Sequence, residues 1–256
     1  TMTEPDDSAI LEGVLSVEAA LEARSREVRA LYIRRDLREY SVLKLVKAAA
    51  ALGARVERVD AEAVDALAQG KSHGGVVAQV GPRQFATLDA LIAGSETPFV
   101  VMLDGVEDPF NFGQAVRAFY AAGATGVVLR PRNWMSAAGV VARASAGTSE
   151  RMPTAIAETL QEAADFFRAR GLQVALAAEE RSQPIHEADL TGPLFLVIGG
   201  EKRGVTRSFA DSADVRLRIP YGRAFGGSLG TTAAAAVIAF EVMRQRRESK
   251  TLTQSE

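Results

Sequence analysis

The chain of 256 residues contains no cysteine and only two histidines, His73 and His186. The absence of cysteine excludes disulfide scaffolds, thiolate zinc sites and cysteine nucleophiles. Two histidines are too few for a multi-histidine metal centre, so we expect no metal. The chemistry of this chain must therefore rest on other residue types.

Long apolar runs are also missing, and the charge is nearly balanced. No stretch approaches the roughly 20 consecutive apolar residues that a membrane-spanning helix needs, and residues 1–7 are polar and acidic. We therefore expect a cytoplasmic protein that makes no membrane contact. Lys and Arg number 30 against 32 Asp and Glu, and the resulting net charge of -2 argues against coating of nucleic acid by bulk electrostatics.

Hydrophobic periodicity divides the chain into two domains. Residues 8–80 predict a small α/β domain, with strands near 28–33, 56–59 and 76–80 separated by amphipathic helices. Gly81-Pro82 and residues 94–98 interrupt this pattern, so we interpret residues 81–97 as a linker. Residues 98–248 then form the second domain.

The second domain alternates apolar runs with helical patterns. Runs at 99–103, 126–129, 172–177, 194–198 and 215–219 predict strands, and 111–122, 158–170 and 228–246 predict helices. This alternation favours a parallel α/β sheet, whose ligands bind beyond the carboxyl ends of the strands. No G-x-G-x-x-G follows a strand, and the nearest phosphate-loop spacing, Gly222 to Gly227, is followed by Ser228 instead of Lys. Both common nucleotide-binding folds are therefore disfavoured.

Three loops, each after a predicted strand of the second domain, have an unusual composition. The first contains Asn111, a favourable N-cap, and Arg117, about two turns further along the helix. The second is residues 199–204, and the third is residues 219–230. Each loop also has an ordinary interpretation: Arg117 as a solvated helix residue, 199–204 as a tight turn, and 219–230 as a flexible loop in which Ser228 caps a helix.

Taken together and in this order, the three loops resemble the SpoU (TrmH-like) branch of the SPOUT methyltransferases. Three sets of residues match the three motifs of that family: Asn111, Gly113 and Arg117; Gly199, Glu201 and Gly204; and Ile219-Pro220 with Ser228-Leu229. In the first half, Glu12-Gly13 and His73-Gly74-Gly75 resemble a small ribosomal-protein-like RNA-binding domain that many members carry. The resemblance spans residues 9–246.

The resemblance implies a fold and an activity. The fold is α/β, with a small N-terminal ribosomal-protein-like domain and a C-terminal parallel-sheet domain knotted as a trefoil. The activity is methyl transfer from S-adenosylmethionine to a ribose 2′-hydroxyl of RNA, with ribosomal RNA preferred. Two alternatives stay open: a tRNA 2′-O-methyltransferase, and a non-catalytic RNA-binding or ribosome-assembly factor, which Gly230 in place of the usual Asn would suit.

The resemblance also assigns roles to individual residues. It implies that the catalytic residues are Arg117, Asn111, Glu201 and Ser228. It implies that the cofactor contacts Gly199, Gly200, Glu201, Ile219, Ser228 and Leu229. Because an arginine side chain stays protonated at neutral pH and is therefore a poor base, we expect Arg117 to stabilise the developing alkoxide or to grip an adjacent phosphate.

Two further expectations concern partners. Residues 24–38 contain six arginines against Glu27 and Asp36, which indicates an RNA-docking surface or, alternatively, an ordinary solvated face. The residues expected to bind RNA are Arg24, Arg26, Arg29, Arg34, Arg35 and, in the third loop, Arg223. The resemblance implies a homodimer formed through the C-terminal domain, and the apolar residues among 237–242 suit either that interface or a core.

Overall fold

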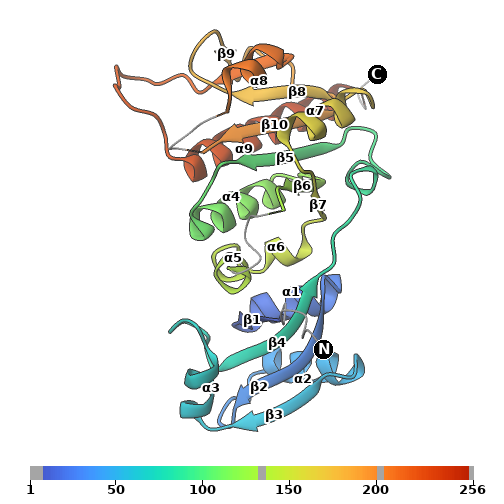
Figure 1. Cartoon of the computed structure of the whole chain (residues 1–256), viewed down its shortest axis with the longest axis vertical. Coiled ribbons are helices and arrows are strands. Elements are labelled where there is room, and N and C mark those ends of the chain that lie inside the picture. The colour runs from blue at the N-terminus through green and yellow to red at the C-terminus, as the bar shows by residue number, and fades with distance from the viewer. Residues whose placement is uncertain (1–7, 132–136, 201–204, 254–256) are drawn as a thin grey trace, which may run out of the picture. The chain divides into compact units, whose positions relative to one another are not determined.

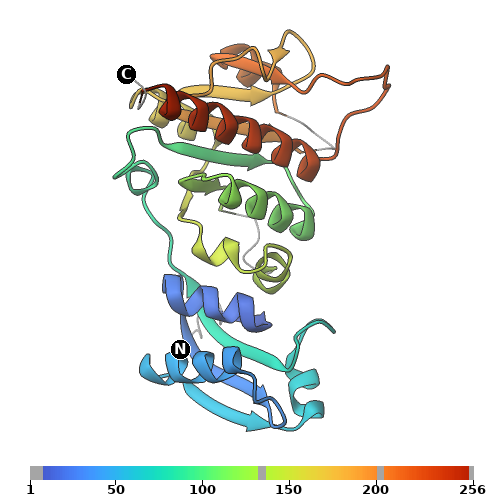
Figure 2. The same cartoon turned by 180° about the vertical axis from the view of Figure 1, so that it is seen from behind.

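The computed structural model describes residues 8–131, 137–200 and 205–253 (Figures 1 and 2). Contacts within the chain divide it into two compact units. The first unit comprises Thr1–Phe85 and Trp134–Arg151, and the second comprises Ala86–Asn133 and Met152–Glu256. Residues 137–151, which lie in the second domain expected from the sequence, therefore pack with the first unit.

The first unit is built on a four-stranded mixed sheet in the order β1-β4-β2-β3. Its strands are β1 (Ala9–Glu12), β2 (Arg26–Arg34), β3 (Arg55–Val59) and β4 (Val76–Arg83). β4 pairs antiparallel with β1 and β2, whereas β2 and β3 are parallel. The hydrophobic pattern does not predict β1, because four residues are too few to show the alternation of a strand.

Helices from two parts of the chain pack in this unit: α1 (Val14–Ala23), α2 (Tyr40–Ala51), α3 (Ala61–Leu67), α5 (Ala138–Ala144) and α6 (Thr148–Arg151). α5 contacts β1 and α6 contacts α1 (Figure 1). Ala142 of α5 is fully buried in the same apolar core as Leu11 and Val17. The core of the first unit thus includes α5, which follows β6 (Gly126–Leu129) of the second unit in the sequence.

Ion pairs of two buried carboxylates connect α5 and α6 to the sheet of the first unit. Glu150 of α6 is paired with Arg26 of β2 at 3.2 Å and with Arg83 of β4 at 3.3 Å. Glu12 of β1 is paired with Arg143 of α5. Burial lowers the pKa of Arg83, and Arg26 adds to this effect while Glu150 opposes it. Charge pairing therefore joins both helices to the strands.

The second unit contains a seven-stranded sheet in the order β7-β6-β5-β10-β8-β11-β9, and every neighbouring pair is parallel. The strands are β5 (Phe99–Asp104), β6 (Gly126–Leu129), β7 (Thr154–Ile156), β8 (Gln173–Ala177), β9 (Gln183–Pro184), β10 (Leu194–Gly199) and β11 (Val215–Arg218). The expected parallel α/β sheet is confirmed.

Helices cover both faces of this sheet. α4 (Pro109–Ala121) and α9 (Thr231–Thr253) lie side by side (Figure 2). On the other face, α7 (Leu160–Arg168) and α8 (Arg207–Ser212) pack in one apolar core with strands of the second sheet. Leu91 of a short 3-10 turn, η1 (Asp89–Leu91), is buried in the same core. Strands covered on both faces are apolar throughout, which is why their sequences show uninterrupted hydrophobic runs. Within the described ranges, no helix is long and apolar enough to cross a membrane.

Candidate active site

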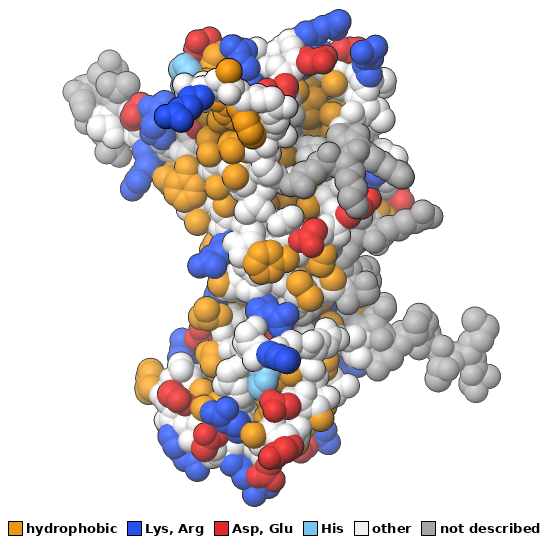
Figure 3. All heavy atoms as spheres, turned by 90° about the vertical axis from the view of Figure 1, so that its left-hand side faces the viewer, with side chains coloured by type: hydrophobic (Ala, Val, Ile, Leu, Met, Phe, Trp, Pro, Cys, Tyr) orange, Lys and Arg blue, Asp and Glu red, His pale blue; other side chains and the backbone are white. Residues whose placement is uncertain are grey.

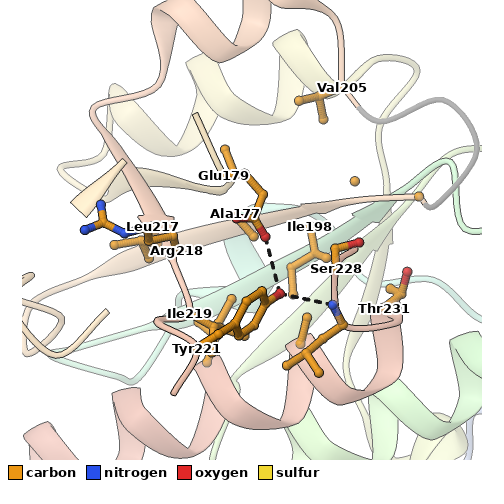
Figure 4. Close-up of a pocket in the computed structure, with 16 residues that line it drawn as sticks. Ala177, Glu179, Ile198, Val205, Leu217, Arg218, Ile219, Tyr221, Ser228 and Thr231 are labelled. Carbon is orange, nitrogen blue, oxygen red and sulfur yellow. Dashed lines mark hydrogen bonds between the residues drawn. The ribbon is translucent and has the colours of Figure 1, made fainter. Parts of the chain in front are cut away.

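A pocket of about 260 Å³ lies at the carboxyl ends of β8, β10 and β11 (Figure 4). Its apolar walls include Ala177, Ile198, Leu217, Ile219, Leu229 and Ile238. Its polar lining residues include Glu179, Arg218, Tyr221, Ser228 and Thr231. Apolar walls with a few polar groups are typical of a small-molecule site, and the carboxyl edge is where parallel α/β sheets bind their ligands.

The second loop reaches this pocket by a backbone approach that only glycine permits. The N–H of Gly200 donates to the carbonyl of Asp104 at 2.7 Å. A Cβ atom on residue 200 would overlap the carbonyl oxygen of Gly105, far inside van der Waals contact. Gly105 has a φ of 79°, a conformation that glycine adopts without strain. The main chain at Gly199-Gly200 therefore forms one edge of the pocket.

The third loop folds back over the pocket through Tyr221. Its hydroxyl accepts a hydrogen bond from the N–H of Leu229 at 3.1 Å and donates one to Oε1 of Glu179 at 3.3 Å (Figure 4). The Tyr221 ring also meets the Phe225 ring edge to face, with 5.5 Å between centroids. Residues from both ends of the loop, Ile219 and Leu229, consequently line the same pocket.

The first motif lies on α4, which starts beside this pocket. Asp108 caps the helix and accepts the N–H of Asn111 at 2.6 Å, while Pro109 occupies the first turn. The expectation that Asn111 is the N-cap is therefore wrong, because the cap lies three residues earlier. The Asn111 carbonyl accepts a hydrogen bond from the Thr232 hydroxyl at 3.3 Å. Since Thr231 lines the pocket, this bond holds the start of α4 next to the pocket wall.

Arg117 lies six residues beyond Asn111 on α4, and its side chain is exposed. Among the residues that the structure describes, no hydrogen bond or ion pair engages its guanidinium. Neither Asn111 nor Arg117 lines the pocket itself. The residues of the first motif therefore lie outside the pocket wall, and the exposed Arg117 is accessible to a ligand that binds from solvent.

The structure brings together five of the six residues expected to contact a cofactor, because one pocket is lined by Gly199, Gly200, Ile219, Ser228 and Leu229. The sixth, Glu201, lies outside the described residues. Ser228 belongs to the pocket and not to a helix cap, since α9 begins at Thr231. Neither Glu179 nor Tyr221 is predicted from the sequence. Glu179 comes two residues after β8, and an acidic residue just beyond the carboxyl end of a strand is a signal that would have identified it.

The arginines of residues 24–38 differ in their exposure. The Arg26 side chain is 7% exposed and holds Glu150, so this arginine faces the interior of the first unit instead of a surface for RNA. Three others pair with exposed carboxylates: Arg29 with Glu27, Arg34 with Asp36, and Arg35 with Asp60. Exposed pairs of this kind contribute only about 0–1 kcal/mol, so a phosphate can replace the carboxylate.

Arg24 and Arg223 occupy exposed positions in different units. Arg24 follows α1 with a φ of 50°, a left-handed conformation that ends the helix. Arg223 lies in the exposed part of the third loop, two residues before Phe225, whose side chain is 58% exposed. Both guanidiniums are therefore accessible to a large polyanion.

Comparison with known proteins assigns both halves of the chain. Residues 98–240 match the family described as the SpoU rRNA Methylase family. The chain belongs to this family. Residues 10–86 match a second family, described as RNA 2′-O ribose methyltransferase substrate binding. The family expected from the three motifs is confirmed, as are the mixed-sheet N-terminal part and the parallel-sheet SpoU domain.

Individual relatives align over nearly their full length. The 23S rRNA (guanosine-2′-O-)-methyltransferase RlmB of Ralstonia nicotianae is 34% identical, over 93% of this chain and 96% of its own. The protein of the same name from Pseudomonas putida is 32% identical, over 92% and 96%. A crystal structure of an AdoMet-bound rRNA methyltransferase from Sinorhizobium meliloti has a TM-score of 0.78 and 26% identity, covering 93% of this chain and 87% of that one.

The pocket of this SpoU protein fits S-adenosylmethionine. Gly199 and Gly200 line the pocket without side chains, so a ligand can approach their main-chain groups closely. Ile219 and Leu229 supply apolar surfaces of the kind that an adenine ring covers. Ser228 and Thr231 add hydroxyl groups at the same edge. Apolar walls together with hydroxyl and main-chain groups therefore suit a nucleoside ligand.

Proposed function

We propose that this protein transfers the methyl group of S-adenosylmethionine to the ribose 2′-hydroxyl of a guanosine in 23S ribosomal RNA. The observation that carries the proposal is that residues of the second and third SpoU motifs line one pocket beside the start of the first motif. The relatives named for this reaction align over 92–93% of this chain and 96% of their own length, and they support the choice of substrate. A ribosomal RNA substrate would require the protein to work in the cytoplasm.

Bound S-adenosylmethionine supplies an electrophilic methyl group on a sulfonium. The ribose 2′-oxygen forms a bond to that carbon while the carbon–sulfur bond breaks, and the hydroxyl proton leaves to solvent or to a nearby acceptor. Because the reaction needs alignment of two groups and no covalent enzyme intermediate, positioning dominates the catalysis. This demand agrees with a chain that contains no cysteine.

We assign the work of positioning to four residues. Arg117, exposed and unengaged among the described residues, stabilises negative charge on the 2′-oxygen or grips the adjacent phosphate. Asn111 orients the target ribose at the start of α4, and Ser228 hydrogen-bonds near the reacting groups from the pocket edge. Glu201 shapes the cofactor loop that follows Gly200. The cofactor itself is held by Gly199, Gly200, Glu201, Ile219, Ser228 and Leu229.

We propose that the first unit docks the RNA. Its exposed arginines, Arg24, Arg29, Arg34 and Arg35, would contact phosphates, and Arg223 of the third loop would do so near the pocket. Arg26 is omitted, because it is buried against Glu150.

We propose the domains expected from the sequence, residues 8–80 for RNA binding, 81–97 as the linker and 98–248 for methyl transfer, with two corrections. β4 runs to Arg83 and Leu91 packs in the core of the second unit, so the boundary between the units lies at residues 85–86. The helices α5 and α6 belong structurally with the first unit.

We also propose a homodimer formed through the C-terminal domain. α4 and α9 contact each other and leave large apolar side chains exposed: Phe110, Tyr120, Val237 and Phe240. The opposite side of α9 is core, since Ile238 and Val242 are buried. Exposed apolar side chains on two adjacent helices are typical of a protein–protein interface. We propose a second copy of this chain as the partner, because most soluble oligomers are symmetric homo-oligomers. Figure 3 shows several groups of hydrophobic side chains among charged ones on the face that it draws.

A ribose-methylation profile of RNA from cells with and without the gene tests the proposal. We expect one guanosine of 23S rRNA to lose its 2′-O-methyl group in the deletion strain and to regain it with the wild-type gene. A strain carrying Arg117→Ala should not regain it. Loss of methylation at a tRNA position would move the substrate to tRNA, and an unchanged profile would favour an assembly factor.

A further inference from the structure

The third loop depends on Tyr221 for its shape. Residues 219–230, all of which the structure describes, form no helix or strand, and residues 222–228 are exposed. The Tyr221 hydroxyl nevertheless joins the two ends of this segment, because it accepts the N–H of Leu229 eight residues later. The same hydroxyl reaches across to Glu179, which follows β8. One hydroxyl thus connects the entry of the loop, its exit and a neighbouring strand end.

We propose that Tyr221 is a positioning residue for S-adenosylmethionine, acting through the main chain of Leu229 and the carboxylate of Glu179. This inference rests on the proposed function of the pocket. All three residues line the pocket, and in Figure 4 the hydroxyl lies between the other two groups. By fixing Leu229, Tyr221 fixes one apolar wall and the main-chain groups next to it.

The hydrogen-bond chemistry of the hydroxyl is matched to this task. A phenol provides one donor and accepts through its lone pairs, so it can take the N–H of Leu229 and give its proton to Glu179 at the same time. At 3.3 Å the bond to Glu179 is long for a hydroxyl donor, so the 3.1 Å bond from the N–H of Leu229 is the better-formed of the two. Arg218, the other charged lining residue, donates to the carbonyl of Ser182 instead. Tyr221 and Glu179 therefore make a side-chain contact between the third loop and the end of β8 at the pocket edge.

Tyr221 also connects the pocket with the exposed tip of the loop. Its ring supports Phe225 edge to face at 5.5 Å, and the intervening residues include Arg223. A change in the position of Tyr221 would therefore displace both the pocket wall and the aromatic ring at the loop tip. We infer that cofactor binding and the placement of residues 222–228 are linked through this side chain.

The test compares Tyr221→Phe with the wild-type protein by calorimetric titration of S-adenosylmethionine and S-adenosylhomocysteine. The variant keeps the ring and loses only the hydroxyl. We expect both affinities to fall about 5- to 30-fold, the effect of losing two ordinary hydrogen bonds. The matched control is Tyr40→Phe, an 83% exposed tyrosine of α2, which should bind as the wild type does.

Hydrogen exchange supplies a readout that needs no cofactor. The amide of Leu229 should exchange faster in Tyr221→Phe, while the strands of both sheets keep their protection and the melting temperature stays unchanged. In turnover, KM for S-adenosylmethionine should rise more than kcat falls, whereas a general loss of structure would lower kcat and stability together.

Equal affinities for wild type and Tyr221→Phe, with unchanged exchange at Leu229, would overturn the inference and leave the proposed function intact. Failure of the wild-type protein to bind either ligand would overturn both. If Tyr221→Phe does not fold, Glu179→Ala removes the acceptor of the same contact: faster exchange at Leu229 with weaker binding of both ligands supports the inference, and unchanged exchange and binding refute it.

Discussion

Glu150 of α6 and Arg26 of β2 form an ion pair at 3.2 Å in which the two side chains are only 2% and 7% exposed. Ser25 also donates its hydroxyl proton to this carboxylate at 2.5 Å. These residues are more than 120 positions apart in the sequence, yet they lie in the same compact unit. The helices α5 and α6, which lie between β6 and β7 in the sequence, therefore include a residue that is ion-paired with the sheet of the first unit.

Removing the Glu150 charge should strongly destabilise the first unit. In Glu150→Gln, Arg26 and Arg83 would remain buried as uncompensated cations, and breaking a buried pair typically costs about 3–5 kcal/mol. Urea unfolding followed by circular dichroism measures the change. The control is Glu27→Gln, which breaks an exposed pair with Arg29 and should alter the free energy of unfolding by less than about 1 kcal/mol. Equal effects of the two variants would contradict the structure.

Gly200→Ala should damage the cofactor pocket. The new methyl group would overlap the Gly105 carbonyl oxygen, so the backbone of one loop must move. We expect a cost of about 1–3 kcal/mol, visible as weaker binding of S-adenosylhomocysteine in a calorimetric titration. Gly192→Ala is the matched control, because a methyl group there would meet no atom within 4 Å. Wild-type affinity in Gly200→Ala would show that the loop is not close-packed.

Arg117→Ala should separate chemistry from cofactor binding. Arg117 does not line the pocket, so the affinity for S-adenosylhomocysteine should stay within about twofold of the wild-type value. The rate of methyl transfer should fall about 100- to 1000-fold, the usual effect of removing one group that stabilises developing charge. Single-turnover kinetics with saturating cofactor measures this rate. The control is Arg247→Ala, an exposed arginine of α9 that should leave the rate unchanged; a wild-type rate in Arg117→Ala would remove the assigned role.

Arginine substitutions in the first unit should fall into two classes. Arg35→Gln removes an exposed charge, so it should weaken RNA binding and reduce the slope of log affinity against log salt by about 1. Arg26→Gln removes a buried partner of Glu150, so it should lower the melting temperature instead. Filter binding at several salt concentrations and thermal unfolding distinguish the two effects. If Arg26→Gln kept the wild-type melting temperature and reduced the slope of log RNA affinity against log salt, Arg26 would be an RNA contact and not a buried structural residue.

Phe240→Asp should produce a monomer. Phe240 is 44% exposed on α9, beside α4, and a carboxylate at this position would be buried without a partner in the proposed interface. Light scattering after gel filtration should give twice the chain mass of 27.2 kDa for the wild type and the single mass for the variant. Leu52→Asp, at a similarly exposed position in the first unit, should remain dimeric. A monomeric wild type would refute the proposed homodimer.

Much of the fold is predictable because hydrophobic periodicity encodes it. The pattern predicts β5, β6, β8, β10 and β11 near their observed positions, and the side chains of β5 are buried on both faces. The three loops that follow β5, β10 and β11 stand out by composition, and two of them build the pocket. Local signals of this kind are readable because the residues concerned are close together in the sequence.

Other features depend on contacts between distant residues. In the sequence, Glu150 and Arg26 are indistinguishable from ordinary surface charges. Only the tertiary structure shows that they form a buried ion pair. The placement of α5 and α6 with the first unit follows from such pairs. The capping of α4 by Asp108 instead of Asn111 is a choice between two good caps three residues apart, which propensity does not decide. Tyr221 acquires its role from the return of the loop at Leu229.

The most direct test of the proposed activity is methyl transfer in a purified system. The purified protein is incubated with S-adenosylmethionine that carries a labelled methyl group and with 23S rRNA from cells in which the gene for this protein is deleted. The RNA is then digested to nucleosides. Mass spectrometry should find the label in 2′-O-methylguanosine, and none when Arg117→Ala replaces the wild type. Label on a base, or no label in any nucleoside, would contradict the proposed activity.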